Sequence, residues 1–350
     1  MSNNQRHDFF DKLQFFTEVA LTYRKRSKRL KREKQAKKNW IIDWIEAFLW
    51  AAGVVLLINQ YLFQAYQIPS GSMIDTLLIG DHIFVNKLVY GPELLPGLGK
   101  IHSPFKPERN DVIIFESPSY ISHGTAFDIA QRIIYMLTLS IVDIDKDEKG
   151  RPKAHFLIKR AVGMGGDRVF NRNGNMYFKF AGEDRIVSEQ DYNIQRGWKH
   201  NVRRLAGETA YDALRYSIQL ELWQMASINM NEANNRIMPD FPVHIEGDTW
   251  ETMRLAADRT VNPHEERFRR RYYRKKLGWY VPPGRVLPLG DNRDNSTDGR
   301  WFGPVHESKI LGQGLFIYWP GRSSEDGGRY SPPLDPPPLK TGPERIGIIR

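Results

Sequence analysis

A long uncharged segment near the N-terminus constrains this chain more than any other feature. No formal charge occurs between Glu46 and Asp75, and the stretch Ala47–Phe63 is strongly apolar. With the residues just before it, this stretch reaches about 20 residues, the length that a helix needs to cross roughly 30 Å of hydrocarbon. A buried core helix is the alternative interpretation. The sequence predicts a single transmembrane helix over residues 40–63.

Basic residues are concentrated directly before this segment. The run Arg24–Lys38 contains ten Lys or Arg and one acid, so it carries a formal charge of +9 out of the net +10 of the chain. Because cytoplasmic flanks of membrane helices are enriched in Lys and Arg, residues 1–39 are expected to be a cytoplasmic segment of a single-pass protein of the cell inner (plasma) membrane. The rest of the chain would then lie on the periplasmic or extracellular side. Its charge is close to neutral, which argues against a nucleic-acid-binding protein.

After the apolar segment the pattern changes to short alternating runs. Runs rich in β-branched and aromatic residues, bounded by Gly, Pro, Asn or Asp, are typical of β-strands. They occur at 82–91, 111–117, 155–163 and 314–320. The sequence therefore predicts a mainly β protein with an antiparallel β-sheet domain and an inserted α+β subdomain, preceded by a single N-terminal transmembrane helix.

Two regions depart from the strand pattern. The apolar stretch Ile133–Val142 is too short to span a bilayer, so a buried strand or helix is expected in preference to an element that dips into the membrane. Residues 182–280 are charged and partly helical, most clearly at Thr209–Met230. We interpret 182–280 as an inserted subdomain, so that 64–181 and 281–350 together would form the main domain.

The first candidate functional segment lies just beyond the apolar stretch. Gln67–Met73 combines Pro69 and a glycine with two serines, Ser70 and Ser72, which favours a tight turn with unpacked hydroxyl groups. Taken alone this is a weak signal, because serine-rich turns are common.

Two later segments add a lysine and a set of polar side chains. Phe156–Gly163 places Lys159 inside an apolar strand, where lysine is rare unless it is paired. Gly290–Arg300 is dense in side chains that hydrogen-bond the backbone and each other; it superficially resembles a calcium loop but lacks the glutamate of the EF-hand pattern. The chain has no Cys and no His pair at ligand spacing, so we expect no metal and no organic cofactor.

Together, in this order and after a membrane anchor, these segments resemble the motif set of the bacterial type I signal peptidases, which are Ser–Lys serine proteases. The resemblance covers the apolar segment and residues 64–117, 155–170 and 281–320, together with the end of the chain. It implies that Ser72 is the nucleophile and Lys159 the general base.

The resemblance also assigns supporting roles. Ser70 would supply an oxyanion-hole hydroxyl beside the backbone N–H of Ser72, and Ser296 would hydrogen-bond the lysine amine. The supporting ion pairs would be those of Asp291 with Arg160 and of Asp298 with Arg300. Shallow apolar pockets for small substrate side chains would be lined by Ile68, Pro69, Met73, Leu77 and Ile158.

Elementary chemistry supports a lysine base. A lysine amine has a reference pKa of about 10.4 and is protonated at pH 7, so it cannot accept a proton from a serine. Burial disfavours the ammonium form and lowers the pKa. The apolar neighbours of Lys159 suit this purpose, and Arg160 would point to the opposite face of the strand.

The resemblance implies a membrane-bound endopeptidase that removes N-terminal signal peptides from secretory pre-proteins with A-x-A-type cleavage sites. The anchor would hold Ser72 a few residues beyond the bilayer surface. A Ser–Lys protease that cleaves itself or one dedicated partner, and an inactive membrane scaffold, are the alternatives. The chain departs from the family pattern at Asp75, where Pro is usual, and at Gly299, where Ser is more usual.

Overall fold

In this computed structural model the chain divides into two compact units, Met1–Val55 and Leu56–Arg350, and each is described by itself. The predicted helix Thr209–Met230 lies outside the described residues. The structure describes residues 14–19, 21–30, 40–94, 100–120, 123–138, 142–146, 155–172, 174–204, 264–266, 269, 273, 277–321 and 342–349.

An apolar helix, α2 (Trp40–Tyr61), leads from the first unit into the second. Its 22 residues correspond to about 33 Å at 1.5 Å per residue, which matches the hydrocarbon thickness of a bilayer. Among the described helices it alone is long and apolar enough to cross a membrane, and none of its apolar window is buried. The prediction of one N-terminal apolar helix of spanning length is confirmed, and its exposure excludes the buried core helix.

The larger sheet of the second unit has eight strands, and all of its pairings are antiparallel. Its order is β1-β2-β11-β3-β4-β9-β10, with β12 paired to β11. Only Leu62 separates the end of α2 from the first strand. The strands are β1 (Phe63–Gln67), β2 (His82–Asn86), β3 (Val112–Glu116), β4 (Phe156–Met164), β9 (Arg285–Leu289), β10 (Val305–His306), β11 (Ile310–Trp319) and β12 (Gly347–Ile348).

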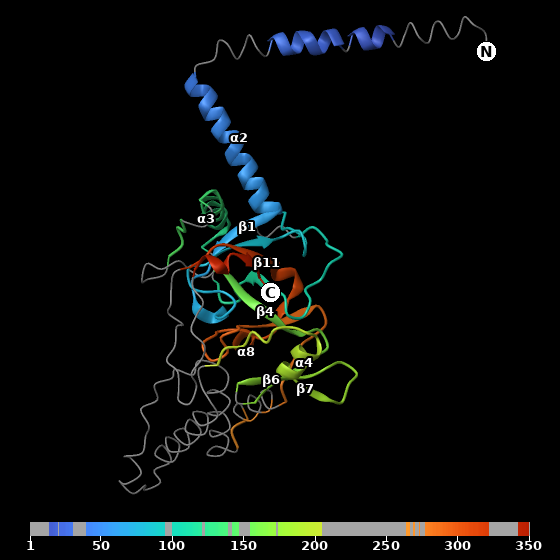
Figure 1. The fold of residues 1–350 in the computed structure, drawn as a ribbon, viewed down its shortest axis with the longest axis vertical. Coiled ribbons are helices and arrows are strands. Elements are labelled where there is room, and N and C mark those ends of the chain that lie inside the picture. Colours follow the sequence, from blue (N-terminus) through green and yellow to red (C-terminus); the bar gives the residue numbers. More distant parts are fainter. Residues whose placement is uncertain are drawn as a thin grey trace, which may run out of the picture. The chain divides into compact units, whose positions relative to one another are not determined.

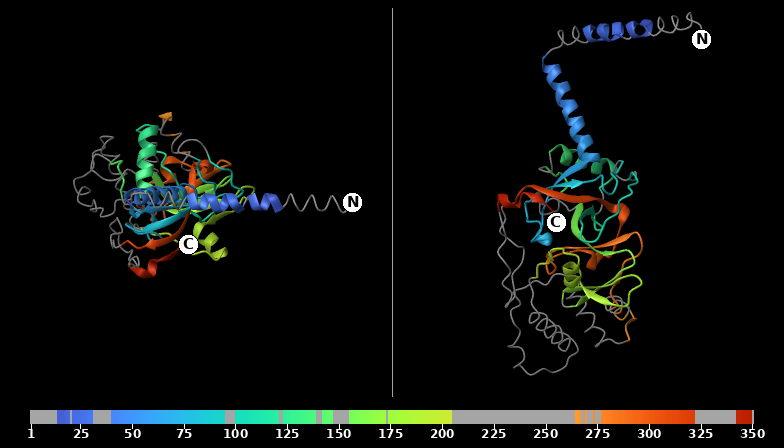
Figure 2. Two further views of the ribbon diagram at one scale, coloured as in Figure 1. Left: turned by 90° about the horizontal axis from the view of Figure 1, so that it is seen from above. Right: turned by 45° about the vertical axis from the view of Figure 1, so that its right-hand side comes forward.

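A second, four-stranded sheet has the order β7-β6-β5-β8 and packs with helix α4 (Glu189–Gln195). Its strands are β5 (Arg168–Arg172), β6 (Asn175–Lys179), β7 (Ile186–Ser188) and β8 (Trp279–Tyr280). Two of these strands precede residue 182. Figure 1 and the right-hand view of Figure 2 show this sheet and α4 apart from the strands of the larger sheet.

The predicted strands are present with shifted ends. The run 82–91 contains β2, but this strand already ends at Asn86. Strand β11 starts at Ile310, four residues before the predicted run 314–320. The runs 111–117 and 155–163 agree with β3 and β4 within one residue. The mainly β, antiparallel fold class is confirmed. Four short helical elements are also described: η1 (Gly71–Met73), α8 (Gly299–Phe302), η3 (Glu307–Lys309) and η4 (Pro343–Arg345).

The expectation that the apolar stretch Ile133–Val142 is buried holds only in part, and residues 139–141 lie outside the described residues. Its first half forms the end of α3 (Thr125–Leu137), in which Met136 is buried and Tyr135 packs against the core, but Ile133 and Leu137 are exposed. The reason is that the charged side chains of α3 share the inner side of the helix with Tyr135 and Met136, which leaves Ile133 and Leu137 outside.

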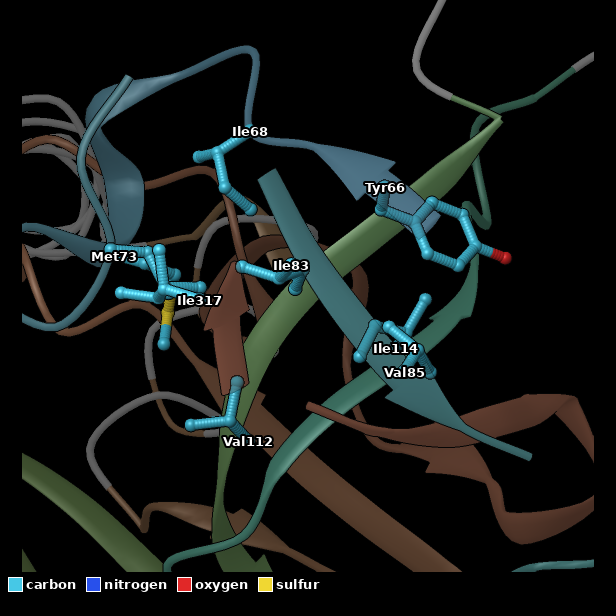
Figure 3. Packing of buried hydrophobic residues seen from close by; sticks show 9 residues of the cluster. Tyr66, Ile68, Met73, Ile83, Val85, Val112, Ile114 and Ile317 are labelled. Carbon is cyan, nitrogen blue, oxygen red and sulfur yellow. The ribbon is translucent and has the colours of Figure 1, made fainter. Parts of the chain in front are cut away.

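One face of the larger sheet packs into a core that also holds the turn after β1. Burial alternates along β2, as expected for a half-buried strand, so Ile83 and Val85 point inward. Figure 3 shows Met73, from the turn, among these strand residues. The complete cluster is Tyr66, Ile68, Met73, Leu77, Ile83, Val85, Val112, Ile114 and Ile317.

Candidate active site

The first component of the site is the turn that follows β1. The chain leaves β1 and enters the short helix η1, which carries Ser72. Two main-chain hydrogen bonds connect Ile68 to the residues just before β2. Its N–H donates to Asp81 O and its carbonyl accepts from Gly80 N, both at 2.8 Å. Met73 is 1 % exposed in the core. The strand pairing and this core anchor together fix the direction in which Ser72 points.

The second component is a lysine in the middle of the sheet. Lys159 lies in β4, opposite Ile113 of β3, and is 3 % exposed. Its Nζ lies 2.6 Å from Ser72 Oγ and donates to Ile158 O at 3.0 Å. Burial lowers the pKa of Lys159 to about 8, although the carboxylates of Asp298 and Asp291 act in the opposite direction. An amine with this pKa is available as a base near neutral pH.

An ion pair lies on the other face of β4, directly after the lysine. Arg160 binds Asp291 through two hydrogen bonds, Nε to Oδ1 at 2.8 Å and Nη2 to Oδ2 at 2.7 Å. Thr76 Oγ1 donates to the same carboxylate at 2.5 Å, and Arg160 Nη1 donates to Asn110 O at 2.9 Å. The structure therefore brings together the predicted pair and links it to the segment that follows the serine turn.

The second predicted pair is also formed. Arg300 Nε and Nη2 each donate to Asp298 at 2.9 Å, and the carboxylate also accepts from Gly290 N at 2.9 Å. Burial by itself would raise the pKa of Asp298, but the Arg300 guanidinium and these hydrogen bonds outweigh it and lower the pKa. The carboxylate thus stays ionised and fixes the loop that begins at Gly290.

The Gly290 loop is in direct backbone contact with the serine turn. Asn292 N donates to Ser72 O at 3.0 Å, and Asn292 Nδ2 donates to Gly71 O at 3.1 Å. A Cβ at Gly290 would collide with the side chain of Ser296 and with the carbonyl oxygen of Ser72. Only glycine permits this approach, so the loop and the turn are held as one unit.

The two supporting serines differ in their placement. Ser70 precedes η1, is exposed, and makes no side-chain hydrogen bond to the start of that helix. Ser296 is 1 % exposed, and no hydrogen bond joins its Oγ to Lys159. The hydroxyl lies close to Asp298 and contributes to the lowered pKa of that carboxyl. The hydrogen bond that we predicted from Ser296 to the amine of Lys159 is therefore not formed in this structure.

The predicted substrate-contacting side chains are mostly interior. Ile68 and Leu77 belong to the core cluster beside Met73, Ile158 packs against that cluster, and Pro69 is exposed. A cavity of about 610 Å³ lies elsewhere, beside Glu116, Tyr120 and His155, and contains neither Ser72 nor Lys159. We do not assign this cavity to the Ser–Lys site.

A further ion pair was not anticipated from the sequence. Arg203, from the region of the second sheet, is 4 % exposed and pairs with Asp75. Its main chain forms a bridge to the Gly290 loop, with Arg203 N donating to Asp291 O at 2.8 Å and Arg293 N donating to Arg203 O at 3.1 Å. Asp75, which stands beside the serine turn where the family usually has Pro, thus has a partner more than a hundred residues later in the chain. No local signal marks Arg203, because arginine is common in charged segments.

A serine hydroxyl within hydrogen-bond distance of a buried lysine, held between two carboxylate–guanidinium pairs, defines a serine hydrolase of the Ser–Lys type. Comparison with known families agrees with this class. The model of the family described as "Signal peptidase, peptidase S26" matches residues 41–319. The chain therefore belongs to the peptidase S26 family of signal peptidases.

Several curated relatives extend over most of the chain. The chain is 28% identical to Signal peptidase I of Haemophilus influenzae over 86% of its own length and 77% of that protein. It is 27% identical to Signal peptidase I of Aquifex aeolicus, covering 77% of this chain and 80% of the relative. With Signal peptidase I of Pseudomonas aeruginosa the identity is 25%, over 82% of this chain and 76% of the relative.

Proposed function

We propose that this chain is a membrane-bound signal peptidase I, a serine endopeptidase that removes N-terminal signal peptides from secretory pre-proteins. In this proposal Ser72 is the nucleophile and Lys159 the general base. The observation that carries the assignment is the 2.6 Å distance between Nζ and Oγ, combined with a lysine whose pKa burial lowers to about 8. The family membership and the Signal peptidase I relatives support the reaction class.

The reaction follows from this geometry in two stages. Neutral Lys159 accepts the proton of Ser72 as Oγ attacks the scissile carbonyl carbon, and the oxygen of that carbonyl becomes an oxyanion. When the tetrahedral intermediate collapses, the C–N bond breaks and the lysine ammonium returns its proton to the leaving amine. Lys159 then takes a proton from a water molecule, which hydrolyses the acyl-enzyme ester and regenerates the serine.

We assign the oxyanion hole to the Ser70 hydroxyl and the backbone N–H of Ser72. Ser70 is exposed two residues before the nucleophile, so it can rotate toward a bound carbonyl. A donor of this kind contributes about 3 kcal/mol to transition-state stabilisation. Ser296, which lies against Gly290 behind the dyad, would hydrogen-bond the amine once a substrate has reordered the site.

We further propose that the substrate binds as an extended segment with an A-x-A-type cleavage site. Small side chains suit this site because closely packed apolar groups lie behind the turn that carries Ser72. Of the five predicted groups, Ile68, Met73 and Leu77 are buried in the core, Ile158 packs against it, and Pro69 is exposed.

The proposed location is the inner (plasma) membrane, with residues 1–39 in the cytoplasm and the sheets on the other side. The support is the basic run before α2, which follows the positive-inside pattern. Within the second unit we propose a main domain that contains the dyad and an inserted subdomain that ends near residue 280. Strands β5, β6, β7 and β8 form one sheet, and β5 begins at Arg168. We therefore favour a start for this subdomain at Arg168, ahead of residue 182.

Cleavage of a secretory precursor by the purified full chain in detergent tests this function. We expect cleavage after the small residue of an A-x-A site, and loss of it in Ser72→Ala and Lys159→Ala. Ser308→Ala and Lys199→Ala, at exposed positions, are the matched controls and should retain activity. Cleavage that survives Lys159→Ala would remove this lysine as the base, and an inactive but folded parent would favour a dedicated-partner protease or a scaffold.

A further inference from the structure

Helix α3 presents an apolar surface to its surroundings. Its exposed residues are Ala126, Ile129, Ala130, Ile133 and Leu137. Their spacing of three, one, three and four residues places them on one face of the helix. No charged or polar side chain interrupts this face, which we call the outer face of α3.

The polar side chains of α3 point the other way. Asp128 accepts a hydrogen bond from Tyr120 OH at 3.1 Å, and Gln131 Nε2 donates to Asp143 Oδ1 at 2.8 Å. Arg132 forms an ion pair with Glu93 at 2.6 Å. A helix on a water-exposed surface has the opposite arrangement, with its apolar residues inward and its charges outward. Tyr135 and Met136 of α3 also pack inward, but the charged side chains lie on the inner side with them, so the side of α3 that faces outward is apolar.

The position of α3 identifies what can cover this face. Asn59 Nδ2, near the end of α2, donates to Met136 O in the last turn of α3 at 3.4 Å. Gln60 Nε2 donates to Glu93 O at 2.9 Å, and Glu93 is the residue that pairs with α3. Asn59 is two residues, or about 3 Å of helix rise, before the end of α2. The contact therefore holds α3 at the depth where α2 leaves the hydrocarbon.

We propose that α3 is an interfacial helix whose outer face inserts into the leaflet from which α2 emerges. This inference rests on the proposed membrane-spanning role of α2. A bilayer is then present at the level of Met136, and an apolar face without charges is the surface that the acyl-chain boundary accepts. The exposed Val142 and Ile144, shortly after α3, extend the apolar surface. The bilayer thus contacts the second unit at two places, the end of α2 and α3.

A second attachment has a direct consequence for the enzyme. A domain held by α2 alone can tilt relative to the bilayer surface, whereas a second attachment through α3 restricts this tilt. Tilting would move the Ser–Lys site toward or away from the bilayer surface, where a membrane-bound substrate emerges. The proposed role of α3 is to fix the angle at which the site meets the membrane-bound precursor.

Single-cysteine labelling is a clean test, because the chain contains no cysteine. The full chain carrying Ile133→Cys is labelled with the fluorophore NBD and reconstituted into vesicles. Its fluorescence should be several-fold lower when the phospholipids carry a quenching doxyl group than when they do not. The matched control is Ile194→Cys, an exposed isoleucine of helix α4, which should not be quenched by the lipid. Each variant is first shown to cleave precursor in detergent.

The outcomes separate the possibilities. Equal lipid quenching at positions 133 and 194 would overturn the proposal. Protection of position 133 from aqueous iodide without quenching by the lipid would also overturn it, since protein would then cover α3. Leu49→Cys in α2 reports on the anchor itself: if this position is not quenched by the lipid, it is the membrane-spanning role of α2 that fails.

A functional measurement completes the test. Replacing the apolar groups in Ile129→Gln/Ile133→Gln should reduce cleavage several-fold in vesicles and leave it unchanged in detergent, where no bilayer orients the domain. Ile194→Gln should behave as the parent in both media. An equal reduction in vesicles and detergent would contradict an interfacial role for α3.

Discussion

At the scale of single residues, the chemistry depends on how strongly the interior disfavours a charge on Lys159. Its pKa of about 8 means that the amine is mostly protonated below this pH and then cannot accept the proton of Ser72. We expect kcat/KM for precursor cleavage to fall about tenfold per pH unit below 8 and to level off above it. A pH profile between 6 and 10 measures this limb; an apparent pKa below 7 would point to a different base.

The buried amine also has a cost in stability. Its pKa is 10.5 in the ordinary state and about 8 in the fold, so unfolding takes up a proton between these values, and stability rises with pH across that window. Below pH 8 the cost is up to about 3 kcal/mol, and it disappears by about pH 10.5. Lys159→Met should therefore raise the free energy of unfolding at pH 7 and lose this advantage at pH 10.5.

Chemical denaturation in detergent at the two pH values measures this difference. Lys199→Met, at an exposed lysine, is the control and should show no pH-dependent gain. A Lys159→Met variant that is equally destabilised at both pH values would contradict the assigned cost of burial.

The sequence was informative about residues whose role depends on local pattern. Ser72 and Lys159 stand in short motifs of unusual composition, and the structure brings them into contact. The partner of Asp75 could not be predicted, because Arg203 reaches it through the folding of a distant charged segment. Whether Ser296 bonds the amine of Lys159 could not be predicted for a different reason, because it depends on the rotamer of a buried side chain and not on its place in a motif.

At the scale of elements, the segment around Arg203 connects two parts of the site that are far apart in sequence. It pairs with Asp75 beside the serine turn and bonds through its backbone to the Gly290 loop. We expect Arg203→Ala to lower kcat several-fold with little change in KM, because it positions the turn without touching substrate. Arg203→Lys should recover part of the loss, and Arg196→Ala, at an exposed position, should have no effect.

A double-mutant cycle with Asp75→Asn shows whether the pair itself is responsible. Residues in contact show coupling energies of about 0.5–3 kcal/mol. Additive losses in the double variant would mean that Arg203 acts through its backbone bridge alone.

A second link joins helix α4 to the same loop. Arg293 is fully buried and donates to both carboxylate oxygens of Glu189, at 2.5 and 2.7 Å. Removing one partner leaves an uncompensated buried charge, so Arg293→Met should cost about 3–5 kcal/mol of unfolding free energy. The double variant Glu189→Leu/Arg293→Met should be more stable than Arg293→Met, as measured by denaturation. A single variant as stable as the parent would contradict a structural role for this pair.

Elements could be predicted where the pattern reflects burial. The four predicted runs overlap with β2, β3, β4 and β11, because each of these strands contributes buried apolar residues to the sheet. Their ends could not be predicted, since they depend on which partner strand continues to pair. The apolar stretch Ile133–Val142 misled because the rule assumes that apolar residues turn inward, whereas Ile133 and Leu137 of α3 face outward.

At the scale of the whole molecule, the proposed orientation can be tested in sealed vesicles. Externally added protease should remove residues 1–39 from molecules that are inserted with these residues outward. It should digest the sheets only in molecules that are inserted the other way round. Because each molecule has one span, no vesicle-inserted molecule should lose both parts before detergent is added. Simultaneous loss of both would contradict a single transmembrane helix.

The contacts of the serine turn also set a time at which the enzyme becomes competent. Gly71 O accepts from Asn292, 221 positions later in the chain, and Thr76 O accepts from Arg345, 269 positions later. At roughly 5–20 residues per second, the ribosome reaches these partners about ten seconds or more after it has made the serine. Throughout that interval the nascent polypeptide already contains its anchor and its nucleophile but has no assembled site. A newly made molecule thus lacks these contacts until Asn292 and Arg345 have been made, and a product terminated before them never assembles the site.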